Sequence, residues 1–209
     1  MDASTLIPAQ ADLTALKAAA SGCTACELHG PATQTVFGSG NPQAKVLLVG
    51  EQPGDVEDQK GIPFVGPAGK LLQRAVAEAG FPPGAVYVTN AVKHFRFELR
   101  GKRRIHQTPL PEHIQACNPW VGAEIAAVRP EIVVCLGATA VKALLGSKYR
   151  VTKDRGELMR YAGPGARPET RALLTIHPSA ILRMPDDARE QGYADLVRDL
   201  AVVVQAVSV

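Results

Sequence analysis

Polar side chains that could act on a ligand follow three apolar runs of this sequence. Glu51 and Gln52 follow KVLLVG, Asn90 ends VYVTN, and His177 follows ALLTI. A carboxylate accepts protons, an amide offers a donor and an acceptor to a planar base edge, and an imidazole can do either. Asn90 alone is equally typical of a turn. Because ligands bind outside the carboxyl ends of strands in open α/β sheets, we expect these side chains to converge on one cleft.

A second candidate is the cation-rich segment KHFRFELRGKRRIH. Between Lys93 and His106 it carries six Lys or Arg residues, one acid and two interleaved phenylalanines. This pattern suits binding to a nucleic-acid backbone, whereas a charge run alone is more often a solvated loop. Gly101 and Pro109 predict a loop rather than a helix. The segment closely follows a strand end, so it could fold over the cleft.

Four cysteines form the third candidate. Cys23 and Cys26 share one Cys-x-x-Cys turn, while Cys117 falls in a predicted helix and Cys135 in a predicted strand, with seventeen residues between them. A zinc ribbon would usually supply a second close pair, so zinc fits poorly. An iron–sulfur cluster needs four cysteines, and the chain has four. The alternative is that Cys117 and Cys135 are buried apolar side chains.

The elements that must position these residues alternate between strand and helix. Apolar runs predict strands at 45–49, 86–90, 131–136 and 172–176, with a further hairpin strand at 156–160. Helical spacing predicts helices at 12–20, 66–80, 111–128, 138–146 and 187–207. The alternation predicts an α/β fold of three layers, with a central, mainly parallel sheet of about four strands between helices, in a single domain over 1–209. The turn from Glu51 to Val65 lacks the glycine spacing of a phosphate loop.

Composition excludes several classes of protein. The chain has 209 residues, a net charge of +3 and no apolar run long enough to cross a bilayer. Its N-terminus lacks the basic and apolar regions of a secretory signal, so we expect a cytoplasmic location. In that compartment the cysteines are ligands or core residues rather than disulfides. We expect a monomer, because no exposed apolar stripe stands out.

Jointly, these motifs resemble the uracil-DNA glycosylase superfamily, and most closely its bacterial iron–sulfur branch known as UdgX, related to the family 4 enzymes. GEQPGDVED with GIPFVGPAG resembles the first active-site motif, VTNAV the base-recognition strand and HPSAILR the second motif. The cysteine pattern resembles the cluster ligands of family 4. KRRIH, from Lys102 to His106, resembles the inserted loop that sets UdgX apart. The resemblance extends from Cys23 to the last helix.

The resemblance implies a uracil-DNA glycosylase-like fold that removes uracil from a base flipped out of DNA. Phe64 would stack on the uracil, Gln52 and Asn90 would contact it, and His177 would donate to the carbonyl that gains charge. A 4Fe-4S cluster would be held by Cys23, Cys26, Cys117 and Cys135. Single-stranded and also double-stranded DNA would be contacted by Lys102, Arg103, Arg104, Ser179, Leu182 and Arg183, with Leu182 or Ile181 as a wedge. Arg103 and Arg104 could also pair with Asp55 or Asp58. The enzyme would associate with the nucleoid when acting.

The resemblance also implies an unusual second step. Where family 1 enzymes have a water-positioning Asp, this chain has Gln52, which cannot act as a base. Glu51 keeps a carboxylate in the site, and His106 would attack C1′ of the sugar to leave a covalent adduct after a single turnover. Three alternatives stay open: a turnover glycosylase in which His106 positions water, a non-catalytic DNA binder, and an iron–sulfur electron-transfer or nucleotide-binding protein. Sequence leaves undecided whether the loop lets His106 reach C1′.

Overall fold

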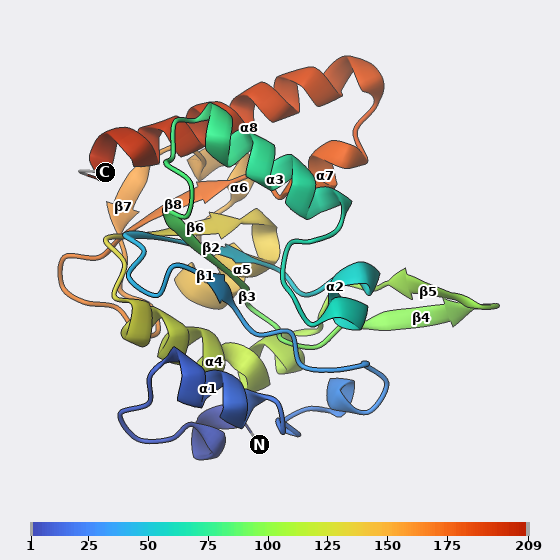
Figure 1. Ribbon diagram of the computed structural model, residues 1–209. Helices are drawn as coiled ribbons and strands as arrows, with labels where there is room; N and C mark the ends of the chain where they lie inside the picture. The colour runs from blue at the N-terminus through green and yellow to red at the C-terminus, as the bar shows by residue number, and fades with distance from the viewer. Residues whose placement is uncertain (1, 208–209) are drawn as a thin grey trace.

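A six-stranded sheet forms the centre of this computed structural model, which describes residues 2–207 (Figure 1). Its strand order is β1-β3-β2-β6-β8-β7. The inner four strands are parallel: β3 (Val86–Asn90), β2 (Val46–Gly50), β6 (Ile132–Leu136) and β8 (Arg171–Thr175). The edge strands β1 (Ser39–Gly40) and β7 (Leu158–Arg160) are antiparallel to their neighbours. The predicted mainly parallel sheet is therefore confirmed for the inner strands, and β7 lies within the predicted hairpin strand.

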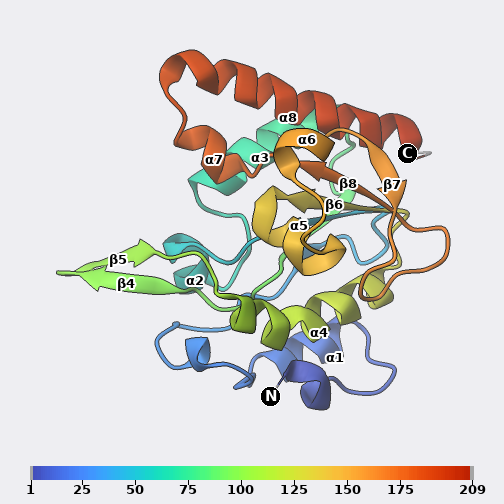
Figure 2. The same cartoon turned by 180° about the vertical axis from the view of Figure 1, so that it is seen from behind.

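Helices cover both faces of the sheet, as Figures 1 and 2 show. Successive side chains of a strand point to opposite faces. Leu47 and Val49 of β2 therefore join one apolar cluster with α4 and α5, whereas Val46 and Leu48 join the other cluster with α3 and α8. Both faces are buried, which explains why these strands are continuous apolar runs. The helices are α1 (Leu13–Ala20), α2 (Asp55–Lys60), α3 (Pro67–Glu78), α4 (Pro111–Val128), α5 (Gly137–Leu145), α6 (Val151–Asp154), α7 (Pro178–Leu182) and α8 (Asp186–Ala206), with short 3-10 turns at Ala3–Leu6 and Glu27–His29.

Two segments differ from the prediction of irregular loops. Within 51–65 the chain forms the short helix α2, whose first turn carries three acids and whose end is Gly61 with a φ of 69°. Acids at a helix N-terminus and a left-handed glycine after its end are both favourable. The basic segment forms an antiparallel hairpin, β4 (Phe97–Arg100) with β5 (Arg103–His106).

The hairpin projects from the body of the protein (Figure 1). Gly101 at its turn has a φ of 59°, a conformation that glycine adopts without strain. The register pairs Phe97 with His106, so His106 lies at the end of the hairpin nearest the sheet. In the described part of the chain, no helix is both long and apolar enough to cross a membrane.

Candidate active site

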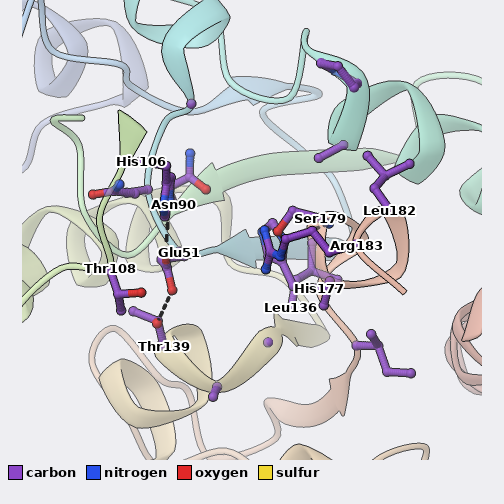
Figure 3. Close-up of a pocket in the computed structure, with 18 of the residues that line it drawn as sticks. Glu51, Asn90, His106, Thr108, Leu136, Thr139, His177, Ser179, Leu182 and Arg183 are labelled. Atoms are coloured by element: carbon purple, nitrogen blue, oxygen red, sulfur yellow. Dashed lines mark hydrogen bonds and ion pairs between the residues drawn. The ribbon is translucent and has the colours of Figure 1, made fainter. Parts of the chain in front are cut away.

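A cavity of about 1240 Å³ opens at the carboxyl edge of the parallel sheet (Figure 3). Its lining includes Glu51 after β2, Asn90 at the end of β3 and His177 after β8. His106 reaches the same cavity from the hairpin. The structure thus brings together the side chains that the sequence placed at separate strand ends.

Three of the side chains that line the cavity pack closely around Gly50, and the part of the cavity that they line is called the Gly50 pocket. A Cβ atom at this position would lie 2.4 Å from Asn90 Oδ1, 2.6 Å from Phe64 Cζ and 3.4 Å from His177 Nε2. A side chain at this position would overlap with Asn90 and Phe64, so a glycine is what allows these cavity-lining residues to lie so close to the strand. Among the described residues, no hydrogen bond occupies the Asn90 amide side chain, although Asn90 is only 3% exposed. A buried, unpaired amide facing a cavity is suited to bind a planar polar ligand.

His177 is held as a neutral hydrogen-bond donor. Its Nδ1 accepts the backbone N–H of Ser179 at 3.1 Å and lies 2.8 Å from Ser179 Oγ. Burial lowers the pKa of His177 to about 4, so the ring is neutral at pH 7. Because Nδ1 is an acceptor, the single ring proton is on Nε2, the atom that faces the Gly50 pocket. Ser179, which we predicted to contact DNA, lines the cavity and also orients this ring.

A chain of three side chains joins Thr139, Glu51 and His106 (Figure 3). Thr139 Oγ1 donates to Glu51 Oε2, and Glu51 Oε1 lies 3.3 Å from His106 Nε2. Burial opposes ionisation of Glu51, but its hydrogen bonds to His106 and Thr139 outweigh burial and lower its pKa. An ionised carboxylate can only accept, so His106 Nε2 carries the shared proton and Nδ1 keeps the free lone pair.

Arg104 fixes the hairpin to α2 rather than offering a free cation. Its guanidinium lies 2.6 Å from Asp55 Oδ1 and 2.6 Å from Asp58 Oδ2. The same group lies over the rings of Phe95 and Phe97. The predicted pairing of Arg104 with these acids is therefore seen, and its predicted role as a direct DNA contact is not supported by this placement.

Gln52 also holds the hairpin. Its Nε2 donates to the carbonyls of Arg96 and Gln107, and its Oε1 accepts the backbone N–H of Arg96. Both ends of the amide are thus bonded to the hairpin. Binding of uracil by Gln52, which lines the cavity, stays a prediction, and the structure adds that its side chain joins β2 to both ends of the hairpin. Sequence could not reveal this, because the partners are backbone groups distant along the chain.

The other predicted DNA contacts lie around the cavity mouth or on the hairpin. Lys102 and Arg103 are on the hairpin, and both side chains are exposed. Arg183 and Leu182 line the cavity, and Leu182 is 38% exposed. Ile181, the alternative wedge, is buried in the core, whereas Leu182 is exposed at the cavity.

Three of the four cysteines lie in one region. Cys23 and Cys117 belong to one buried cluster, against which Cys26 packs. Trp120 Nε1 donates to Cys23 Sγ at 3.3 Å, and the backbone N–H of Lys93 donates to Cys117 Sγ at 3.2 Å. Hydrogen bonds to sulfur are typical of cluster ligands. Burial raises the pKa of Cys117 to about 12, so this thiol is protonated at neutral pH.

Cys135 is placed apart from these three residues. It lies in β6, one residue before the strand ends, in the apolar cluster between the sheet, α4 and α5 that also contains Tyr161. Burial alone raises its pKa to about 12. The prediction that Cys135 is the fourth ligand is therefore corrected: residue type and count suggested it, but Cys135 packs in a different cluster from the other three cysteines. Among residues 2–207 no group of three His, Cys, Asp or Glu is arranged around a single metal ion.

His94 is a side chain that could complete a cysteine-rich donor set. It follows Lys93, whose N–H reaches Cys117, and burial lowers its pKa to about 4, so its imidazole is neutral. Neutral imidazole is a common metal ligand. In the structure its Nε2 lies 2.9 Å from Thr35 Oγ1.

Thr139 is the site residue that sequence reasoning missed. It begins α5 directly after β6, so it occupies the same kind of position as Glu51, Asn90 and His177. The rule that polar residues after parallel strands line the cleft would have found it, had it been applied to the strand ending at Leu136.

Acid is expected to destabilise the wild-type protein more than a His177→Asn variant. The imidazole titrates near 6.5 in the unfolded chain and near 4 in the fold, so the unfolded state binds more protons as pH falls. Stability is then complete above pH 6.5 and is lost progressively toward pH 4. The effect between pH 7 and pH 5 should be about 1–2 kcal/mol, reduced by water in the cavity. Urea unfolding of both proteins at the two pH values measures it, and equal losses would contradict the assignment.

This chain is similar to a group of proteins whose names state one activity. Residues 37–201 match the family model described as the uracil DNA glycosylase superfamily. A type-4 uracil-DNA glycosylase of Thermotoga maritima is 38% identical over 162 residues, which is 77% of this chain and 78% of that protein. A type-4 uracil-DNA glycosylase of Pyrobaculum aerophilum is 34% identical over 83% of this chain and 86% of that protein. A type-4 uracil-DNA glycosylase of Archaeoglobus fulgidus is 33% identical over 83% of this chain and 84% of that protein. The matched family region includes the whole cavity lining and leaves out Cys23 and Cys26.

Proposed function

Because the chain belongs to the uracil-DNA glycosylase superfamily, we propose that it excises uracil from DNA and then bonds covalently to the abasic sugar through His106. The observation that carries the first step is the pocket around Gly50, where Phe64, Asn90 and His177 converge. The observation that carries the second is His106 in the same cavity, held by Glu51. Within the superfamily we assign the chain to the family 4-like, UdgX branch, on KRRIH and its placement at this cavity.

Base excision requires the uracil to enter the pocket as a flipped nucleotide. Phe64 supplies a ring face for stacking, and the free Asn90 amide pairs with the edge of the base. As the C1′–N1 bond breaks, its electron pair moves onto the uracil, and the Nε2–H of His177 donates to the carbonyl oxygen that becomes negative. Removal of such a donor from an active site typically costs about 10²–10³ in rate.

The covalent step follows from what is left in the cavity. Departure of uracil leaves a cationic sugar, and Glu51, Phe64 and His106 surround the space. A lone pair of the His106 ring forms the new bond to C1′, and the ring becomes an imidazolium. The Glu51 carboxylate stabilises this cation through the proton that it already shares with the ring. Nδ1 carries the free lone pair in this conformation, so Nδ1 forms the bond to C1′ while Nε2 keeps its proton toward Glu51. Gln52, at the position where family 1 enzymes have the water-positioning Asp, is an amide that is bound to the hairpin.

An iron–sulfur group fits three of the predicted ligands. Cys23, Cys26 and Cys117 would hold it, and His94 is the candidate for the remaining position. When bound, such a group joins the N-terminal segment to α4 and adds its binding energy to folding. No step of the reaction is assigned to it, because the cavity is built from other residues.

The iron content of two alanine variants should show which of the buried cysteines, Cys117 or Cys135, is a cluster ligand. Cys117→Ala is expected to lose most of the bound iron and visible absorption, whereas Cys135→Ala should keep both, because only Cys117 lies with the Cys-x-x-Cys turn. His94→Ala should reduce iron as Cys117→Ala does. Iron and acid-labile sulfide are measured on the purified proteins. Loss of iron from Cys135→Ala would restore the four-cysteine assignment.

Thr139→Val is expected to slow adduct formation about tenfold, since loss of one hydrogen bond to a charged group is worth about 1.5 kcal/mol. Uracil release should change less than adduct formation does, because Thr139 contacts Glu51 and not the base pocket. Thr139→Ser keeps the hydroxyl and is the matched control. Single-turnover time courses on a denaturing gel give the adduct rate, and equal rates for the Val and Ser variants would exclude this role.

The proposed function is tested by mixing purified protein with a uracil-containing oligonucleotide. The products are divided between an SDS-containing denaturing gel and an assay of free uracil, with a thymine-containing oligonucleotide as the control. We expect free uracil and a shifted band in about one-to-one ratio. Uracil without a stable band would leave a turnover glycosylase, and binding without uracil would leave a DNA binder. Parallel single- and double-stranded substrates determine which form of DNA is used.

A further inference from the structure

A fully buried ion pair lies behind the base pocket and has no part in the reaction described above. The side chains of Lys93 and Glu124 are both 0% exposed, and Lys93 Nζ is bonded to Glu124 Oε2. Two further bonds satisfy the ammonium: Nζ donates to Thr89 Oγ1 at 2.6 Å and to the Asn90 carbonyl at 2.8 Å. All three N–H groups of this lysine are therefore used.

The pair acts on the residue that faces the base. Asn90 is the last residue of β3, where the ladder of sheet hydrogen bonds ends. On one side, Gly50 pairs with Asn90 and accepts the N–H of Ala91. On the other side, the ammonium holds the Asn90 carbonyl. The backbone that aims the Asn90 amide into the pocket is thus fixed from both sides.

Glu124 ties this arrangement to α4. Its carboxylate accepts from the backbone N–H of Gly38, from the hydroxyl of Tyr87 and from Thr89 Oγ1, each at 3.0 Å. Burial and the adjacent carboxylate raise the pKa of Tyr87, so that its hydroxyl stays a donor. The carboxylate is therefore saturated with donors, as a buried charge must be.

Lys93 also contacts the cysteine region through its backbone. Its N–H donates to Cys117 Sγ. Cys117 and Glu124 are seven residues apart on α4, which is two helical turns, so they present their side chains on the same side of the helix. Lys93 is thereby hydrogen-bonded through its main chain to Cys117, a predicted cluster ligand, and through its side chain to β3, which carries Asn90.

We propose that Lys93, anchored by Glu124, is a positioning residue that holds Asn90 in the orientation that reads the uracil edge. This inference rests on the proposed excision of uracil. A pair of apolar residues could fill the same space, and exchanging buried ion pairs for apolar residues is often neutral or stabilising. Apolar side chains could not hold the Asn90 carbonyl, however. The geometry therefore points to a role in orientation rather than in stability.

The test is a double-mutant cycle between the ion pair and Asn90. Lys93→Met alone leaves the Glu124 carboxylate buried without a counter-charge and can unfold the protein, so the working variant is Lys93→Met with Glu124→Gln. Its single-turnover rate of uracil release is compared with wild type, with Asn90→Ala and with the combined triple variant. Tyr161→Phe, which removes one buried hydrogen bond to the Pro164 carbonyl outside the cavity, is the control for general loosening.

The paired variant should release uracil about 10–100-fold more slowly than wild type, the range expected for misplacing a contact by up to about 1 Å. In the Asn90→Ala background the same exchange should change the rate less than twofold, because the residue it positions is gone. Tyr161→Phe should stay within twofold of wild type. An equal loss in both backgrounds, or no loss in either, overturns the role of Lys93. Absence of uracil release by the wild type would instead overturn the proposed function.

Discussion

Replacing His106 by alanine or serine is expected to eliminate the adduct that resists denaturation, while uracil release continues. The base pocket is formed by Phe64, Asn90 and His177, so excision should stay within about tenfold of wild type, or about 1.4 kcal/mol of activation free energy. The adduct needs a ring nitrogen at C1′, and neither methyl nor hydroxyl supplies one. Adduct on SDS gels and free uracil are measured on the same samples.

The matched control is Gln107→Ala, one residue further along. Gln52 binds the backbone carbonyl of Gln107, so the hairpin keeps this attachment when the side chain is removed. The control should form adduct as wild type does. A His106→Ala protein that still forms the stable band would show that another nucleophile captures the sugar. Loss of both uracil and adduct would place His106 in the excision step instead.

Gly50→Ala is expected to have the largest effect on excision itself. The added methyl group would lie 2.4 Å from Asn90 Oδ1 and 2.6 Å from Phe64 Cζ, well inside contact distance. Asn90 and Phe64 must move apart, and the space for the base closes at the same time. Displacement of reacting groups by about 1 Å costs on the order of 10² in rate. Single-turnover uracil release should therefore fall at least about 10²-fold.

The control for Gly50→Ala is the same substitution at another glycine, Gly30. At Gly30 the nearest neighbour of an added Cβ is a backbone oxygen at 3.5 Å, an ordinary contact, so Gly30→Ala should excise uracil normally. Binding to uracil-free DNA should be unchanged in both variants, because the cavity mouth is untouched. If Gly50→Ala retained the wild-type rate, the base would have to bind elsewhere in the cavity.

The contacts that attach the hairpin to the body of the protein explain why His106 lies beside Glu51 in the cavity. Arg104 joins β5 to α2, and Gln52 joins the hairpin ends to β2. Both contacts lie within a few residues of His106. The hairpin therefore carries His106, the proposed nucleophile, on a short, fixed strand, which is the arrangement that would favour attack on a nearby cation over capture by water.

Several features of the protein followed from the sequence alone. The inner strands are continuous apolar runs because both of their faces are buried, and this local pattern located β2, β3, β6 and β8 within about a residue or two. Helical spacing located α3, α4, α5 and α8 in the same way. The convergence of Glu51, Asn90 and His177 followed from one general property, that parallel strands end at a common edge.

Only the tertiary structure decided which partner each side chain has. Gln52 and Arg104 are polar residues suited to bind ligands, yet their bonds go to the hairpin and to α2, which lie close only after folding. Cys135 is a cysteine like the others, but its strand register turns it into the core that contains Tyr161. Secondary structure depends on neighbours in sequence, whereas a hydrogen bond or a metal ligand depends on the distance between groups that are far apart in the chain. That difference is why the elements of the site could be predicted, whereas the hydrogen bonds of Gln52 to the hairpin and the packing of Cys135 apart from the other cysteines could not.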